Sequence, residues 1–384
     1  MGRNTVVVAG LFGAGLALAY SVATVQEGNQ PVTVGAPAVS SPAPVASAPA
    51  PVKEFTVLAS GDVLIHPALT EQAVADSSTT APDFGPLLAG VAPVVSAADL
   101  ALCHLEVPLA QPAGPYVGYP SFSAPPQVAA ALAATGYDSC STASNHTLDQ
   151  GRAGVLRTLD ALDSAGLAHT GSARSAQEAA RPLILDLGVA RVAQVSFTYG
   201  FNGLELPANA PWLANTLNPD AVLHAARTAK QAGADVVIAS LHWGAEYQAE
   251  PTDAQRELAA WLLADPAIDL IVGHHAHVVQ PFELIDGEWV AYGLGNHVAR
   301  HAEPRGSTEE GVLARFTFTL RSEGWRVTKA EYLPTLVELG PPIRLLDLST
   351  APPSARSAQA LERIDQVVFS RGASQATLTR PAPR

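Results

Sequence analysis

Residues able to bind a metal ion recur along this 384-residue chain, each at or just after the end of a short apolar run. They are Asp62, His104, Glu106, Asn145, His146, His242, His275 and His277. A mixture of carboxylate, amide and imidazole ligands is typical of manganese, iron or zinc, whereas oxygen ligands alone would indicate magnesium or calcium. The pattern therefore predicts a site for a divalent transition metal.

Each of these residues has an ordinary interpretation when it is taken alone. Asp62 could cap a turn, and a lone histidine is usually a hydrogen-bonded core or surface residue, which is how we interpret His169, His224 and His301. Five apolar runs with such endings are much harder to explain structurally. His275 and His277 are two residues apart, so both can face one site from an extended segment.

The elements that must position these residues alternate along the chain. Apolar runs typical of strands cover 55–60, 100–105, 137–143, 192–197, 236–241 and 268–272. Helical spacing covers 126–134, 152–165, 219–232 and 253–263. Asp286-Gly287 predicts a hairpin between 282–285 and 289–292; antiparallel strands follow at 313–320 and 325–333, then a helix at 358–368. This order predicts an α/β fold whose parallel or mixed sheet carries its site at the strand ends.

Several motifs together resemble the CapA family of poly-γ-glutamate capsule synthesis proteins, a branch of the calcineurin-like metallophosphoesterases. The resemblance covers roughly residues 55–339. Its motifs are Ala59-Ser60-Gly61-Asp62, His104-Leu105-Glu106, the segment 143–151 around Asn145-His146, the segment 240–247 around His242, Gly273-His274-His275-Ala276-His277, and Tyr292-Gly293-Leu294-Gly295-Asn296. The family implies layered β-sheets flanked by helices, and a metal-dependent site.

Carried over residue by residue, the resemblance implies that two metal ions are held by Asp62, Glu106, Asn145, His242, His275 and His277. It places His146 where metallophosphoesterases have the histidine that stabilises or protonates the leaving group. Asp149 is then a candidate to orient an imidazole, although it could equally cap the helix that begins near Arg152. Glu246 and Asn296 match motif positions and either touch metal or shape the pocket.

The chain departs from the family pattern at three positions. The wider superfamily has Asp-x-His at its first motif, where this chain has Leu64, so His66 is the candidate to substitute for that histidine. His104 stands where the family usually has asparagine, and is either a changed ligand or a polar replacement. His297 replaces a common aromatic residue. The ligand set at one metal position is therefore open.

Charge and cysteine content narrow the function classes. With 22 Lys and Arg against 35 Asp and Glu, the net charge of -13 argues against non-specific nucleic-acid binding, and an anionic substrate would need positive charge from the metal ions. Two cysteines are too few for a disulfide framework. Burial of Cys103 and Cys140 as separate core residues is the favoured interpretation, with a disulfide as the alternative in an extracytoplasmic protein.

The chain before the body has two parts. Residues 1–26 contain an uncharged run from Thr5 to Val25, which is either an uncleaved membrane anchor, favoured by its length, or a cleaved signal peptide. Residues 27–53 are rich in proline and alanine, as an extended spacer would be. We expect a metallophosphoesterase-like domain at 54–340, and a C-terminal helix with a disordered tail at 341–384.

Two hypotheses for function share the predicted site. The first is a metal-dependent hydrolase that cleaves a phosphoester, or an amide bond of a polyglutamate chain. The second is a non-catalytic component of a capsule synthesis and export complex that binds poly-γ-glutamate beside membrane synthase or export subunits. Both place the body outside the cell membrane, on a single N-terminal anchor, or secreted if that segment is cleaved.

Overall fold

The computed structural model describes residues 52–373 and 377–381, together with Ser21, Ala23, Thr24 and Gly35. The folded body begins with strand β1 at Glu54. The predicted anchor and most of the predicted spacer lie outside the described residues. Among the described residues, no helix is both long and apolar enough to cross a membrane.

The body is built from two mixed β-sheets. The larger sheet has the order β14-β13-β12-β1-β2-β3-β4, with β11 paired to β1 and β15 paired to β13. Its strands are β1 (Glu54–Leu64), β2 (Leu100–Leu105), β3 (Ser139–Ser141), β4 (Ala168–Thr170), β11 (Asn296–Ala299), β12 (Glu310–Arg321), β13 (Gly324–Glu338), β14 (Arg344–Asp347) and β15 (Leu378–Thr379). The smaller sheet has the order β5-β6-β7-β8-β10-β9. Its strands are β5 (Leu183–Asp186), β6 (Arg191–Thr198), β7 (Val236–His242), β8 (Leu270–His274), β9 (Phe282–Ile285) and β10 (Glu288–Ala291).

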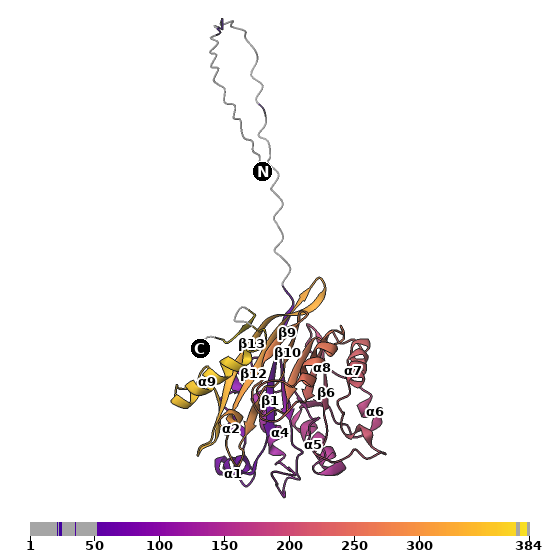
Figure 1. The fold of residues 1–384 in the computed structure, drawn as a ribbon, viewed down its shortest axis with the longest axis vertical. Coiled ribbons are helices and arrows are strands. Elements are labelled where there is room, and N and C mark those ends of the chain that lie inside the picture. Colours follow the sequence, from indigo (N-terminus) through magenta and orange to yellow (C-terminus); the bar gives the residue numbers. More distant parts are fainter. Residues whose placement is uncertain (1–20, 22, 25–34, 36–51, 374–376, 382–384) are drawn as a thin grey trace, which may run out of the picture. The chain divides into compact units, whose positions relative to one another are not determined.

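Helices flank the pair of sheets (Figure 1). They are α1 (Pro67–Asp76), α2 (Gly85–Leu88), α3 (Ala92–Val95), α4 (Gln127–Thr135), α5 (Gly151–Ala165), α6 (Ala176–Ala179), α7 (Pro219–Gln231), α8 (Asp253–Leu263) and α9 (Ala355–Val368), with 3-10 turns η1 (Pro211–Leu213) and η2 (Ser307–Glu309). Local sequence explains several of their starts: Pro219 follows the capping Asn218, and Thr252 forms a capping box with Gln255.

Three apolar layers hold the body together. Side chains from both sheets, among them Val57, Ile238 and Phe316, form one buried cluster between the sheets. A second cluster lies between the larger sheet and α1 to α4, and a third lies between the smaller sheet and α7 and α8. The predicted layered α/β fold, with sheets flanked by helices, is therefore confirmed.

Parallel pairing brings the predicted site residues to one edge. β1 runs parallel to β2 and β11, β2 to β3, and β7 to β8. Two glycines allow very close backbone approach there. A Cβ at Gly61 would lie 2.0 Å from the Gly295 carbonyl oxygen, and one at Gly273 would lie 1.8 Å from that of Tyr292. Any larger residue at these two positions would push the strands apart.

The predicted long elements are present, with shifted ends. Helix α8 has the predicted bounds, α5 and α7 each differ from theirs by one residue at one end, and α4 is shifted by one residue at both ends. Strand β3 is much shorter than the predicted 137–143, and β12 and β13 are longer than predicted. Strands β4, β5, β11 and β14 are not predicted by the sequence patterns. Strand β14 pairs with β13, while α9 packs against β12 and β13.

The end of the chain is partly described. The predicted disordered tail includes residues 374–376 and 382–384, which lie outside the described residues. Between them, β15 pairs in parallel with Ala330 and Glu331 of β13.

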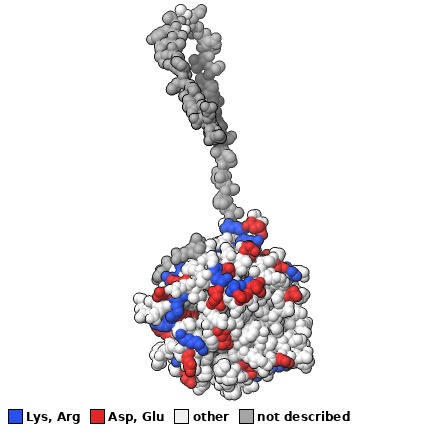
Figure 2. All heavy atoms as spheres, viewed as in Figure 1, with Lys and Arg blue, Asp and Glu red and all other residues white. Residues whose placement is uncertain are grey.

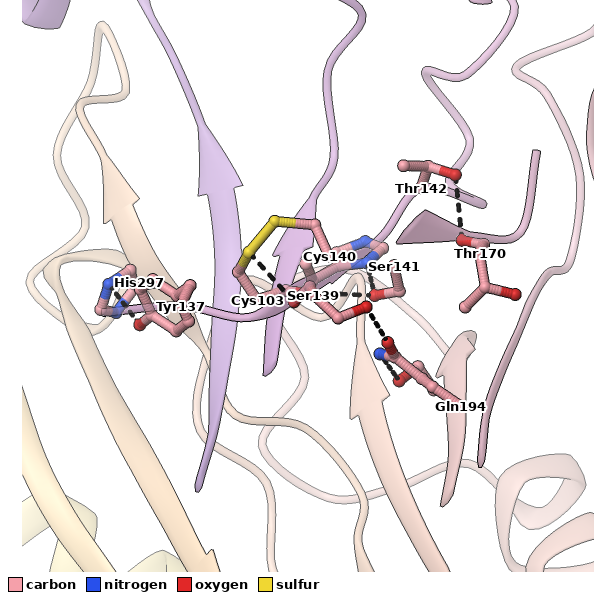
Figure 3. Close-up of a disulfide and its surroundings, with 11 residues drawn as sticks. Cys103, Tyr137, Ser139, Cys140, Ser141, Thr142, Thr170, Gln194 and His297 are labelled. Atoms are coloured by element: carbon pink, nitrogen blue, oxygen red, sulfur yellow. Dashed lines mark hydrogen bonds between the residues drawn. A yellow bond between two sulfur atoms is a disulfide. The ribbon is translucent and has the colours of Figure 1, made fainter. Parts of the chain in front are cut away.

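Cys103 and Cys140 form a disulfide between the parallel strands β2 and β3 (Figure 3). Their Cα atoms are 4.4 Å apart, and both residues are buried. The favoured interpretation of two separate core cysteines is therefore wrong, and the alternative is right. Strand pairing explains why, because it sets the two residues directly opposite each other. A disulfide is typical of proteins in an oxidising compartment.

Charged side chains of both signs are interspersed on the face shown in Figure 2.

Glu288 is an acidic residue in an unfavourable, partly buried position. Burial, helped by the nearby Asp269 carboxylate, raises the pKa of Glu288 to about 7, although Arg326 and Lys230 oppose the shift. The Oε2 atom of Glu288 has no hydrogen-bond partner within the described residues.

Removal of the disulfide should destabilise the body. The bond closes a loop with a sequence separation of 37 residues, and cross-links of this kind stabilise by about 2–4 kcal/mol. We expect Cys103→Ala/Cys140→Ala to lower the free energy of unfolding by about that amount, measured by urea denaturation. Prior reduction should shift the wild-type curve but not that of the variant. Coincident wild-type and variant curves would contradict the pairing.

Glu288→Gln should stabilise the protein at alkaline pH. A folded-state pKa above the unfolded one means that the folded protein binds the extra proton, so stability falls as pH rises through the window from 4.5 to about 7. After allowance for solvent screening, we expect a gain of about 1 kcal/mol at pH 8.5 and little at pH 4. Glu257→Gln, on the exposed face of α8, is the matched control. Equal effects of the two substitutions at pH 8.5 would refute the prediction.

Candidate metal centre

Asp62 lies at the middle of the candidate centre. It is fully buried near the carboxyl end of β1, where it pairs with His104 of β2 and Asn296 of β11. Its Oδ2 accepts a hydrogen bond from the His275 backbone N–H at 3.1 Å and lies 3.2 Å from His277 Nδ1. Its Oδ1 is 3.3 Å from His274 Nδ1, without hydrogen-bond geometry. Residues from distant segments thus converge on one carboxylate.

Glu106 supplies a second buried carboxylate. It is 1% exposed, with Oε1 3.7 Å from His277 Nε2 and 4.0 Å from His242 Nε2. Within the described part of the chain, neither oxygen of Glu106 has a hydrogen-bond partner, and neither does Oδ1 of Asp62. Buried carboxylate oxygens without partners carry a large desolvation cost, which a divalent cation would offset. The donor set therefore fits a metal ion.

A chain of imidazoles and polar groups lines the other side. His242 Nε2 is 2.9 Å from Asn145 Oδ1, while its Nδ1 is 3.0 Å from His104 Nε2. His104 Nδ1 is in turn 2.8 Å from Ser141 Oγ. Burial holds the pKa of both imidazoles well below the usual range, helped by neighbouring histidines. Neutral imidazole is the form that binds a metal.

The pKa of His277 is shifted in the opposite direction from those of His104 and His242. Burial alone would lower the pKa of His277, but the Glu106 and Asp62 carboxylates raise it to about 10. Burial would likewise raise the pKa of Asp62, yet His274 and His277 hold it well below its usual range. For Glu106, burial dominates and raises the pKa well above the usual range. Positive charge close to Glu106 would keep this carboxylate ionised.

The loop after β8 is strained where it carries its candidate ligands. His275 has a φ of 93° and His277 a φ of 56°, both in the left-handed region that side-chain-bearing residues rarely adopt. Such backbone persists only where the surrounding structure holds it, and it is typical of functional sites. Both imidazoles are 3% exposed and their ring centroids lie 6.1 Å apart.

His146 and Asp149 form a separate pair beside the centre. His146 Nδ1 is 2.7 Å from Asp149 Oδ2, which also accepts from the Phe122 backbone N–H at 2.7 Å. Helix α5 is preceded by Gln150 and has no side-chain cap. The capping interpretation of Asp149 is therefore wrong, and its carboxylate orients the His146 ring. With Nδ1 held in this way, Nε2 is the ring nitrogen available to a substrate.

Most of the predicted site residues fall into three groups whose ligand atoms lie within 4.8 Å of one another. The groups are Asp62, His104 and His242; Asp62, Glu106 and His277; and Glu246, His275 and His277. Asn145 contacts His242, and Asn296 Oδ1 is 3.0 Å from His277 Nδ1. His66 belongs to none of these groups, and its Nδ1 accepts from the Arg300 backbone N–H at 3.2 Å.

Sequence reasoning missed four residues near this centre. His274 stacks on His104 with ring centroids 4.0 Å apart, and His301 Nε2 is 3.3 Å from Asn296 Nδ2. Tyr199 lies 4.6 Å from the His275 ring, and Asn202 is 3.3 Å from Asn145. His274 could have been suspected from the run His-His-Ala-His. His301 was interpreted as an ordinary residue, because its place depends on contacts with distant segments.

A cleft of about 720 Å³ adjoins the centre. His146, Glu246 and His277 line it on the metal side. The other walls include His66, Tyr119, Tyr247, Arg300, His301 and Arg305. Two candidate ligands, Glu246 and His277, can therefore be reached from this cleft.

Comparison with known proteins identifies the family. Residues 56–301 match the family model described as bacterial capsule synthesis protein PGA_cap, and the chain belongs to this family. It is 29% identical over 223 residues to the capsule biosynthesis protein CapA of Bacillus anthracis, covering 57% of this chain and 53% of that protein. It is 32% identical over 177 residues to the PGA biosynthesis protein CapA of Bacillus subtilis, covering 46% and 45%.

The chain thus spans about half the length of the curated relatives it matches. Among solved structures, a calcineurin-like phosphoesterase from Bacillus subtilis, YfkN, shares 16% identity, with a TM-score of 0.46, over 82% of this chain and 98% of that one. This is a loose likeness of fold.

Loss of two imidazoles should empty the centre. We expect the wild-type body to purify with transition metal, up to about two ions per chain, and His275→Ala/His277→Ala to lose most of it. Elemental analysis of both proteins measures this directly. His224→Ala, on the exposed face of α7, is the matched control and should keep its metal. Equal metal content in all three proteins, or none in any, would overturn the site.

Proposed function

We propose that this protein is a metal-dependent hydrolase of a cell-envelope polymer, with poly-γ-glutamate as its substrate class. The observation that carries the proposal is a set of three buried carboxylate oxygens, Asp62 Oδ1 and both oxygens of Glu106, which have no hydrogen-bond partner among the described residues and face imidazoles beside a cleft of about 720 Å³. Family membership supplies the connection to capsule polymer.

We propose two divalent transition metal ions, of manganese, iron or zinc, held by Asp62, Glu106, Asn145, His242, His275 and His277. Glu246 and His104 each belong to one of the three ligand groups and are further candidates. When bound, such ions activate water and polarise the bond under attack. The mixed nitrogen and oxygen donors favour these metals over magnesium and calcium.

The protein's own residues supply proton transfer and positioning. Asp149 accepts from His146 Nδ1 and so fixes the ring orientation, which leaves Nε2 to donate a proton to the leaving group. Asn202 Oδ1 accepts a hydrogen bond from Asn145 Nδ2 at 3.3 Å, and Asn202 Nδ2 lies 3.5 Å from His146 Nδ1, so Asn202 lies between this histidine and the candidate ligand beside it. Asn296 and the Asp62 carboxylate together orient His277.

One observation favours a second candidate, a non-catalytic component that binds the polymer through metal. Leu64 occupies the position where the wider superfamily has a histidine, and it is buried in the apolar cluster beneath the larger sheet. His66 faces the cleft rather than the ligand groups. No imidazole thus stands at that position, which favours a centre that binds the polymer without cleaving it.

We further propose that the body works outside the cell membrane on its N-terminal tether, or is secreted, next to synthase or export subunits of a capsule complex. The disulfide between Cys103 and Cys140 supports an oxidising compartment. The family's capsule role supports a place at the cell envelope.

His146→Gln separates the two candidates. A hydrolase should lose turnover by about 10²-fold or more while keeping its metal, because a positioned general acid contributes about 10²–10⁴-fold. Asp149→Asn should show a smaller loss. Turnover is measured on a phosphodiester and on γ-linked polyglutamate, with metal content measured in parallel. Unchanged turnover in His146→Gln, or no turnover of either substrate by metal-loaded wild type, would favour the binding role.

A further inference from the structure

The cleft beside the candidate metal centre contains two arginines without acidic partners. Arg300 and Arg305 follow β11 on the segment that leads to η2. In the described part of the chain, neither has a carboxylate within 4.0 Å, whereas Arg344 pairs with Asp76, and Arg356 pairs with Glu310. In a chain with a net charge of -13, two unpaired arginines in one cleft need an explanation.

Both arginines are held in place by neutral contacts. The guanidinium of Arg305 lies over the Tyr247 ring, 4.1 Å from its centroid, and the Arg305 backbone N–H donates to Thr308 Oγ1 at 3.4 Å. The Arg300 backbone N–H donates to His66 Nδ1, and its Nη1 donates to the His301 carbonyl oxygen. The Tyr247 ring and the His301 carbonyl oxygen orient the two guanidinium groups, and most of their N–H donors have no partner within the described residues.

The arginines lie close to the metal side of the cleft. Between them in the sequence is His301, whose ring centroid lies 5.5 Å from that of the candidate ligand His277 and whose Nε2 lies 3.3 Å from Asn296 Nδ2. Arg300, Arg305 and His277 line the same cleft. An anion held by the arginines would therefore lie next to the centre.

We infer that this cleft is a carboxylate-binding subsite, in which Arg300 and Arg305 hold free carboxylates of a polymer chain beside the bond presented to the metal centre. The inference rests on the proposed function and names how its substrate is recognised. Arginine's planar fork matches a carboxylate with two parallel hydrogen bonds.

Other groups in the cleft favour carboxylates over phosphates. Glu71, Glu246 and Glu303 also line it, so the two arginines do not create a strongly positive field. A phosphate dianion would meet repulsion from these acids, whereas singly charged carboxylates spaced along a neutral backbone would meet much less. Tyr119 is 80% exposed, and its ring offers an apolar face for the methylene groups of such a chain.

The test is calorimetric binding to the full chain loaded with Mn²⁺. The probe is a short γ-linked glutamate oligomer, compared with the same oligomer whose free carboxylates are amidated. Charge-assisted hydrogen bonds are worth about 1.5–3 kcal/mol, so we expect Arg300→Gln and Arg305→Gln each to weaken binding about tenfold or more. Neither should change metal content or binding of the amidated oligomer. Arg305→Lys, which keeps the charge but not the fork, should lie between Arg305→Gln and wild type.

Arg321→Gln is the matched control. Arg321 is exposed at the end of β12 beyond Thr319, which pairs with Glu54 at the start of β1, so it lies at the far end of that strand from Asp62. Binding by both cleft variants as tight as by this control would overturn the subsite and leave the proposed function standing. No binding of the oligomer by metal-loaded wild type would overturn the polymer function as well. Tighter binding of inorganic phosphate than of the oligomer would overturn the carboxylate assignment.

Discussion

The burial of two carboxylates, Asp62 and Glu106, is the constraint on which the centre of this protein depends. Burying an isolated carboxylate costs several kcal/mol even after the surroundings relax. Around these two, the body places His274, His277 and the His275 backbone N–H, yet three of the four carboxylate oxygens remain without hydrogen bonds within the described residues. A protein would not keep such an arrangement for stability alone, because apolar side chains of similar size would serve better.

The order of the strands brings the residues around these two carboxylates together. Only parallel neighbours set the carboxyl ends of β1, β2 and β3 side by side, and the second sheet brings β7 and β8 to the same edge. Gly61 and Gly273 let backbones approach where a Cβ would clash, and the left-handed conformations of His275 and His277 turn both rings inward. The packing of the two sheets, the backbone turn after β8 and the placement of the candidate ligands therefore depend on one another.

Sequence patterns predicted what depends on local order. Apolar runs ending in polar residues identified β1, β2, β7 and β8, and helices such as α8 were found from their spacing and caps. What failed depends on pairing between distant segments. The disulfide follows from the register of β2 against β3, and the place of His301 follows from its contact with Asn296 of β11, which in turn contacts His277 of the loop after β8. Short half-exposed strands such as β4 and β5 lack the hydrophobic signal that marks a buried strand.

The same geometry explains why catalysis and binding are difficult to tell apart from ligands alone. Both roles need a cation beside Asp62 and Glu106, and both need a cleft that admits an anionic chain. Catalysis differs from binding in that it also needs a proton donor held in place by residues other than the candidate metal ligands. Asp149 is committed to His146 rather than to capping α5, and Phe122 donates to the same carboxylate oxygen, which holds the pair in one orientation. A proposed hydrolase needs such a fixed proton donor, so the His146 and Asp149 pair is the feature on which the proposed chemistry depends.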